Sequence, residues 1–225
     1  MQYFEKNGRN RGNPWSLRQT GVYQQVTLTE GISNWIILQP SNSCRSQLDK
    51  IMQSNTRGET LLAMNPMLLH LHFLTAMAGQ WEEYIQNLHD SLKELVSCFF
   101  YSIYHYVIEN GQDDKASFSA VGHKRRYDFS VAFADSQKLH LLRQKLFQAQ
   151  VMLQAALDTT AQCIRHCHQL DKNRVAIPCG DIITAFQVFN SETNVHQRKI
   201  RTMIRISNGT EILVCQSVLI LIPSH

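Results

Sequence analysis

The sequence has 225 residues, of which 44% are hydrophobic and 18% charged, a balance typical of a globular protein and not of a disordered chain. Its net charge of +4 reflects a local excess of lysine and arginine between residues 172 and 205, so it is neither strongly acidic nor strongly basic throughout. The six cysteines are scattered without any Cys-x-x-Cys spacing, which predicts reduced thiols in an intracellular protein instead of a disulfide framework.

The first forty residues predict a loose arm and then a β-hairpin. Residues 1–14 are rich in glycine, asparagine and arginine, which is typical of an arm without regular structure. Gly21 to Leu28 alternates between apolar and polar residues, and Thr29 to Gly31 supplies a turn before the apolar run from Trp35 to Leu38. This pattern predicts two paired strands. The unbroken apolar run indicates that the second strand is covered on both faces.

Helices are predicted from there to Leu95, and a third strand is predicted further on. Ser43 to Ser54 has the pattern of a short helix, and Asn65-Pro66 reads as the cap and first position of the next. Gly79 marks a bend, after which an amphipathic pattern resumes. Tyr127 to Phe133 alternates apolar with small or polar residues, which predicts a half-buried strand.

The longest predicted element is a helix that starts after Asp135 as its N-cap and reaches Leu170. Neither proline nor glycine interrupts it, so we expect a rod of roughly 50 Å that needs another helix of this chain, or a second copy, along its length. Ten positions spaced three and four residues apart form one apolar seam with a single polar member, the pattern of a coiled coil. They are Leu139, Leu142, Leu146, Ala149, Leu153, Ala156, Thr160, Cys163, Cys167 and Leu170.

A second long helix is predicted from Asp181, its cap, to an interruption at Ser207-Asn208-Gly209. The short connection between the two long helices predicts an antiparallel pair. The second half of the second long helix carries a basic patch, defined as Arg198, Lys199, Arg201 and Arg205. Such a patch can meet nucleic acid, anionic lipid or only solvent.

Together these elements predict an α+β fold: a small antiparallel sheet with packed helices, followed by two long antiparallel helices of the stalk type. The corresponding domains are a loose arm at 1–14, an α/β domain at 15–134, a helical hairpin at 135–206 and an atypical tail at 207–225. Within the second domain, 96–112 is a candidate insert. The uncharged stretches of the chain are short or interrupted, so we expect no transmembrane helix.

The residues give little support for enzyme chemistry. Cys163, His166 and Cys167 would share one face of a helix, and Zn²⁺ accepts both ligand types. Both cysteines also continue the apolar seam as small hydrophobic side chains, so we predict no metal site there. His70 and His72 diverge on a helix and are expected in the core or at its rim. Nucleotide-binding and hydrolase motifs are absent from the sequence, so we expect no catalytic or cofactor-binding residues.

Four blocks of sequence run from Trp15 to Tyr23, from Asn34 to Ser41, from Met67 to Leu74 with Trp81 to Tyr84, and from Tyr127 to Leu139. In this order, within two stretches at 4–95 and 115–214, they resemble the fungal CorA-like transporter domain. The resemblance implies a cytosolic α/β domain that feeds a long stalk helix. It also implies a Mg²⁺-conducting homo-oligomer whose pore is made by membrane helices. The basic patch would then lie near the cytoplasmic membrane surface, and nucleic acid would be no partner.

The sequence departs from that family in two ways. The pore signature Gly-Met-Asn and the membrane helices are missing, and Ala63-Met64-Asn65 lies too far upstream to replace the signature. We therefore expect a soluble piece on the cytoplasmic side that does not transport ions by itself. The segment 96–112 begins Val-Ser and ends Gln, which splice-site codons could encode, so we hypothesise that it and 215–225 are translated intron. The alternative is a free-standing helical protein-interaction module whose seam binds a partner.

Overall fold

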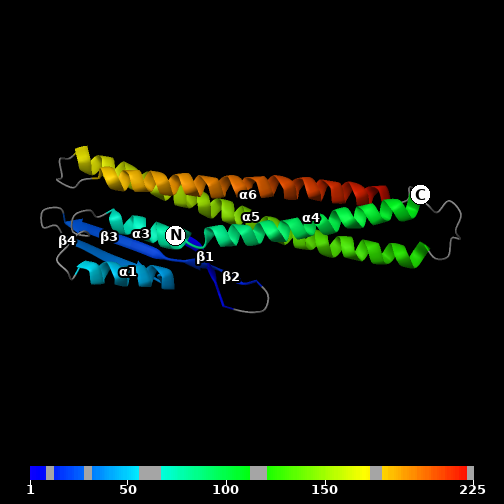
Figure 1. The fold of residues 1–225 in the computed structure, drawn as a ribbon, viewed down its shortest axis with the longest axis horizontal. Coiled ribbons are helices and arrows are strands. Elements are labelled where there is room, and N and C mark those ends of the chain that lie inside the picture. Colours follow the sequence, from blue (N-terminus) through cyan, green and yellow to red (C-terminus); the bar gives the residue numbers. More distant parts are fainter. Residues whose placement is uncertain (9–12, 28–31, 56–66, 112–120, 173–178, 222–225) are drawn as a thin grey trace. The chain divides into compact units, whose positions relative to one another are not determined.

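The computed structural model describes residues 1–8, 13–27, 32–55, 67–111, 121–172 and 179–221. Within them the chain is an α+β protein of two small antiparallel sheets and long helices, which confirms the predicted fold class (Figure 1). Its elements are β1 (Gln2–Lys6), β2 (Trp15–Gln19), β3 (Gly21–Thr27), β4 (Ile32–Leu38), α1 (Asn42–Asn55), α3 (Leu68–Ala78), α4 (Trp81–Gly111), α5 (Val121–Lys172) and α6 (Gly180–Leu221).

The predicted hairpin is present as β3 and β4, whose register places Tyr23 opposite Ile36 and Gly21 opposite Leu38. Its coverage differs from the prediction. Tyr23, Ile36 and Leu38 lie on an exposed face, while the alternate residues Val22, Trp35 and Ile37 pack against the core. The second strand is therefore covered on one face only. Exposed apolar side chains are common on protein surfaces, so an unbroken apolar run does not require cover on both faces. The predicted turn at 29–31 lies outside the described residues.

The expected loose arm at 1–14 contains a strand. Gln2–Lys6 forms β1, which pairs antiparallel with β2 and places Phe4 opposite Leu17. The aromatic side chains of this sheet pack against α4. Phe4 stacks on Tyr84 with ring centroids 3.8 Å apart, and Trp15 meets the same ring edge-on at 5.2 Å. Trp81 meets Phe4 edge-on at 5.8 Å, so one aromatic cluster fastens β1 and β2 to the first turn of α4.

Helices α1 and α3 pack together and cover the inner face of the β3–β4 hairpin. The shared core contains Cys44 of α1 together with Leu69, Phe73, Ala76 and Met77 of α3. Ser41 starts α1, because its hydroxyl oxygen accepts a hydrogen bond of 3.0 Å from the backbone N–H of Cys44. The predicted bend is confirmed, since α3 ends at Ala78 and α4 begins at Trp81. The predicted cap at Asn65-Pro66 lies outside the described residues.

The chain divides into two compact units. The first combines Met1–Tyr84 with Val151–Gln197, and the second combines Ile85–Gln150 with Arg198–His225. In the first unit, Leu170 of α5 packs in one cluster with Ile182, Phe186 and Phe189 of α6. In the second unit the buried side chains come from three helices: Leu88, Leu92, Leu95 and Phe99 of α4, Leu139, Leu142, Leu146 and Ala149 of α5, and Ile200 and Met203 of α6. The predicted domain boundaries at 134 and 206 both fall within continuous helices.

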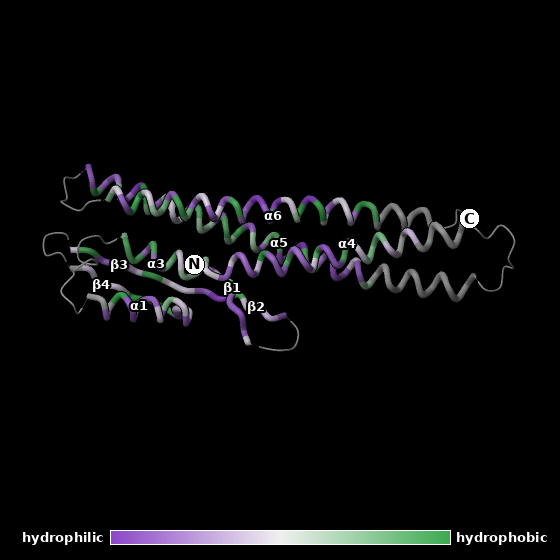
Figure 2. Tube along the Cα trace, in the orientation of Figure 1, coloured by the Kyte–Doolittle hydropathy of each residue, from purple (hydrophilic) through white to green (hydrophobic). Residues whose placement is uncertain are grey.

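Both long helices extend further than predicted. Tyr127 to Phe133 belongs to α5, so the prediction of a third strand is wrong. The helix is continued because, once nucleated, it gains a hydrogen bond with every residue, and no proline stops it. Asp135 is consequently not an N-cap; it is buried inside α5, with an ion pair of 2.8 Å to Lys138. Figure 2 shows the alternation of hydrophilic and hydrophobic residues along the described part of this helix.

The predicted interruption of the second long helix is also absent. Helix α6 starts at Gly180, so Asp181 lies in its first turn instead of capping it, and it passes through Ser207 to Gly209. The Ser207 hydroxyl donates a hydrogen bond of 2.9 Å to the Ile204 carbonyl, and that of Thr210 donates to Ile206 at 2.9 Å. These hydroxyls are satisfied within the helix, so they do not terminate it.

Candidate functional site

Three thiols gather in the first unit, where the α5–α6 connection begins and ends. Cys167 of α5 and Cys179, which precedes α6, are both buried, with exposed fractions of 0% and 1%. Cys163 lies one helical turn before Cys167 and is half-buried at the rim of the same cluster. The thiols of Cys167 and Cys179 are joined by a hydrogen bond. We call Cys163, Cys167 and Cys179 the thiol cluster.

The environment of Cys163 and Cys167 favours their protonated forms. Burial, followed by the neighbouring Cys179 thiol, raises the pKa of Cys167 to about 12. Burial also raises the pKa of Cys163. Because the thiolate is both the nucleophile and the metal ligand, these thiols are poorly reactive at neutral pH.

Cys163, His166 and Cys167, which would share one face of a helix, lie in different environments. His166 is exposed, whereas Cys167 points into the core. Among the described residues, no group of three or more His, Cys, Asp or Glu side chains is placed to hold a metal ion. The neighbour that the sequence did not indicate is Cys179, because its approach to Cys167 depends on how the intervening chain returns.

The predicted interaction seam is packed inside the single chain. Its leucines are all buried: Leu139, Leu142, Leu146, Leu153 and Leu170. Its polar member, Thr160, is also buried and donates a hydrogen bond of 2.7 Å to the Ala156 carbonyl. The rod thus finds cover in the chain's own helices, which was one of the two arrangements expected from the sequence. A role of this seam between chains stays a prediction.

The basic patch lies on the surface of α6 in the second unit. Arg198, Lys199, Arg201 and Arg205 are all exposed. Arg198, Arg201 and Arg205 follow a spacing of three and four, so they form one stripe along the helix. In the same unit, Arg143 of α5 forms an ion pair with Glu211 of α6. What the patch binds stays a prediction.

The histidines of α3 belong to the core and its rim, as expected. The Nε2–H of His70 donates a hydrogen bond of 2.8 Å to Gln24 Oε1, and the His70 ring lies 4.8 Å from that of Trp35. Burial, followed by the nearby His166, lowers the pKa of His70, and burial lowers that of His72. Neutral imidazoles are therefore favoured in the folded protein.

A groove of about 280 Å³ lies within the first unit. Its walls are mostly apolar and come from the ends of β1 and β2 and from four helices; they include Leu74, Met77, Trp81, Met152, Ala156 and Phe189. Among the described residues that line it, none carries a carboxylate, an imidazole or a thiol. The groove can accommodate an apolar group, and its described lining lacks the carboxylates and imidazoles that most often act as general acids and bases.

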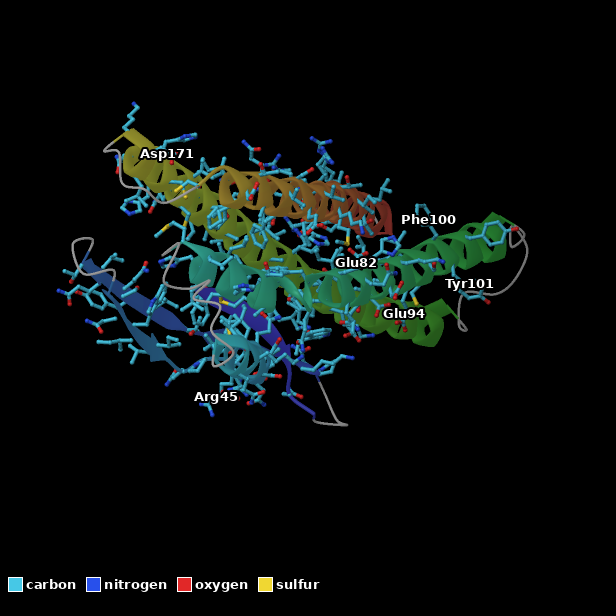
Figure 3. All side chains as sticks on the ribbon, turned by 60° about the vertical axis from the view of Figure 1, so that its left-hand side comes forward. Arg45, Glu82, Glu94, Phe100, Tyr101 and Asp171 are labelled. Atoms are coloured by element: carbon cyan, nitrogen blue, oxygen red, sulfur yellow. The ribbon has the colours of Figure 1, made fainter. Side chains whose placement is uncertain are left out.

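Two further features escaped the sequence analysis. Gln197 is buried on α6, and its Nε2 donates a hydrogen bond of 2.7 Å to Gln154 Oε1 on α5. On α4, Phe100, Tyr101 and Tyr104 are exposed, with exposed fractions of 55%, 69% and 66%; Figure 3 labels the first two. Aromatic residues at helical spacing are ordinarily buried, so the sequence did not indicate that these three side chains would be exposed.

The described fold is that of a helix-rich α+β protein with a small two-sheet head. Among the described residues, no helix is both long and apolar enough to cross a membrane. Over residues 1–99 the chain matches the family model described as CorA-like transporters, a segment that contains β1 to β4, α1, α3 and the first part of α4. No curated protein and no solved structure matches the chain.

Proposed function

We propose that this chain is a non-catalytic scaffold domain of a CorA-like divalent metal-ion transporter. The observation that carries the proposal is the similarity to CorA-like transporters over residues 1–99. That segment includes a packed head in which two strand pairs and two helices share apolar and aromatic contacts. Mg²⁺ is the ion that the family resemblance suggests, and it would be cargo of the whole transporter, not a cofactor of this chain.

The long helices suit a role in connecting the head to other parts of a transporter. Each turn of a continuous helix is hydrogen-bonded to the next, so a displacement of one end also displaces the other end. We propose that this domain acts on the cytoplasmic side and that full-length assemblies are homo-oligomers. Because the leucine seam is already covered, contacts between copies would use other surfaces, such as the exposed Ile206, Ile212 and Leu213 of α6.

Transcript sequencing past the codon for His225 tests the transporter proposal. We expect transcripts in which the reading frame continues into two apolar helices of about 20 residues each, with Gly-Met-Asn at the pore. Expression of that longer product should raise Mg²⁺ uptake in cells starved of Mg²⁺, whereas expression of residues 1–214 should not. A complete set of transcripts in which no membrane helix follows this frame would contradict the proposal.

A second candidate is a protein-interaction module, which the exposed aromatic end of α4 favours. Phe100, Tyr101 and Tyr104 place large apolar rings on the surface, where partner proteins commonly bind aromatic side chains. Pull-down with the intact chain should then recover a partner that a Phe100→Ser, Tyr104→Ser variant no longer binds. The matched control is Leu141→Ser, which changes an equally exposed apolar residue on α5. Equal recovery by all three proteins would exclude this surface.

A further inference from the structure

The thiol cluster has one sulfur at its rim and two in its interior. Cys163 is half-buried and packs against the cluster that contains Cys167 and Cys179. Cys167 and Cys179 are hydrogen-bonded through their side chains, so their sulfur atoms are neighbours although they come from different segments. None of the three sulfur atoms forms a disulfide in the structure. A peroxide molecule would meet Cys163 first, because the other two are covered.

We propose that hydrogen peroxide converts Cys167 and Cys179 into a disulfide, with Cys163 as the thiol that reacts first. The inference does not depend on the transporter proposal. In the first step the Cys163 sulfur attacks one peroxide oxygen, the O–O bond breaks, and the products are a sulfenic acid and one water. In the second step the Cys167 sulfur displaces the hydroxyl group as a second water, and a Cys163–Cys167 disulfide forms.

The third step moves the bond to the buried pair. Residues four apart on a helix have Cβ atoms about 5–6 Å apart, whereas a relaxed disulfide needs about 3.5–4.5 Å. The Cys163–Cys167 bond is therefore strained, and strained disulfides exchange readily. The Cys179 sulfur attacks that of Cys167, Cys163 leaves and takes up the proton that Cys179 gives up. In total two thiols lose two electrons and two protons, and one peroxide becomes two waters.

The product would tie the end of α5 to the start of α6. Cys167 lies near the last turn of α5, and Cys179 immediately precedes α6. The bond closes a short loop, which restricts the unfolded chain and leaves the packed helices where they are. The reaction is expected to be slow at neutral pH and faster as the pH rises, since burial raises the pKa values of Cys163 and Cys167.

Peptide mapping after peroxide treatment tests the proposal on the full, folded chain. Reduced protein is exposed to hydrogen peroxide, alkylated at intervals and digested without reductant. We expect a linked peptide that joins Cys167 to Cys179 within monomers, a higher unfolding temperature of the oxidised protein, and reversal of both by dithiothreitol. A folded protein in which Cys163 becomes overoxidised while Cys167 and Cys179 still alkylate after unfolding would overturn the proposal.

Two serine variants separate the roles of the thiols. Cys163→Ser should slow formation of the Cys167–Cys179 link several-fold, while leaving the product the same. Cys98→Ser is the matched control, because Cys98 is an exposed thiol outside the thiol cluster, and it should leave the rate unchanged. Circular dichroism of each variant confirms that it is folded. An unchanged rate in Cys163→Ser would refute the assignment of Cys163 as the first thiol to react.

Discussion

Two adjacent leucines on α5 give the sharpest test of the buried seam. Leu142 belongs to the seam and is 5% exposed, whereas its neighbour Leu141 on the same helix is 57% exposed. We predict that Leu142→Ala destabilises the chain strongly and that Leu141→Ala hardly changes its stability. Leucine and alanine have similar helix propensities, so the backbone contribution is small in both variants and nearly cancels in the comparison.

The expected magnitude follows from burial. Truncation of a buried leucine to alanine removes its transfer free energy and leaves a cavity, at a cost of about 2–5 kcal/mol in the free energy of unfolding. An exposed apolar residue is expected to change it by about 0.5 kcal/mol or less. With a urea dependence of about 2–3 kcal/mol per molar, Leu142→Ala should lower the midpoint of urea unfolding by about 1–2 M.

Urea titrations at several protein concentrations make the comparison. If both variants lose the same small amount, the seam is not buried within the chain. If the loss in Leu142→Ala grows on dilution, the seam is covered by a second copy instead of by the chain's own helices. Either result would refute the packing described for the second unit.

Three further predictions concern separate parts of the chain. Burial holds the pKa of His70 below its ordinary value of 6.5, so the unfolded chain takes up protons first as the pH falls, and stability should decline below about pH 6.5. Urea midpoints measured across this pH range should decline less in His70→Gln than in the unchanged protein. An unchanged pH dependence would count against the lowered pKa of His70 as the cause. Gln154→Leu should cost about 1–3 kcal/mol in urea unfolding, because the buried amide of Gln197 loses its acceptor; Gln154→Glu, which keeps an acceptor oxygen, should cost less, and equal losses would argue against the bond. Transcript reads that join the codons of Leu95 and Asp113 should be found if 96–112 is translated intron, and a transcript pool that always retains the segment would disprove it.

Much of the local structure could be predicted from the sequence because its signals are short-range. The alternation before residue 30 and the apolar run after it specified the β3–β4 hairpin, and Gly79 separated α3 from α4. The three-four spacing from Leu139 to Leu170 identified a helix edge that the structure buries. Such patterns succeed where side chains repeat with the period of the element that they form.

The misses come from interactions between distant residues. Strand β1 was missed because its own composition does not indicate a strand. It forms through hydrogen bonds to its partner β2. The alternation in Tyr127 to Phe133 fitted a strand over seven residues, but the range lies in an uninterrupted helix. Cys179 joined Cys167 only through the return of the chain, so no spacing could reveal it. Helix ends are likewise set by capping and packing together, so single residues do not locate them. For this reason Asp135 was wrongly predicted to cap α5, and Ser207 to interrupt α6.

Hydrogen exchange along α5 tests the central claim most directly, namely that one unbroken helix is covered by the chain's own helices. We predict slow exchange of the backbone amides from Leu139 to Leu170, with the same protection over a wide range of protein concentrations. Fast exchange in the middle of this range would show a broken rod. Protection that disappears on dilution would show that the apolar seam is covered by another copy, and it would contradict this account.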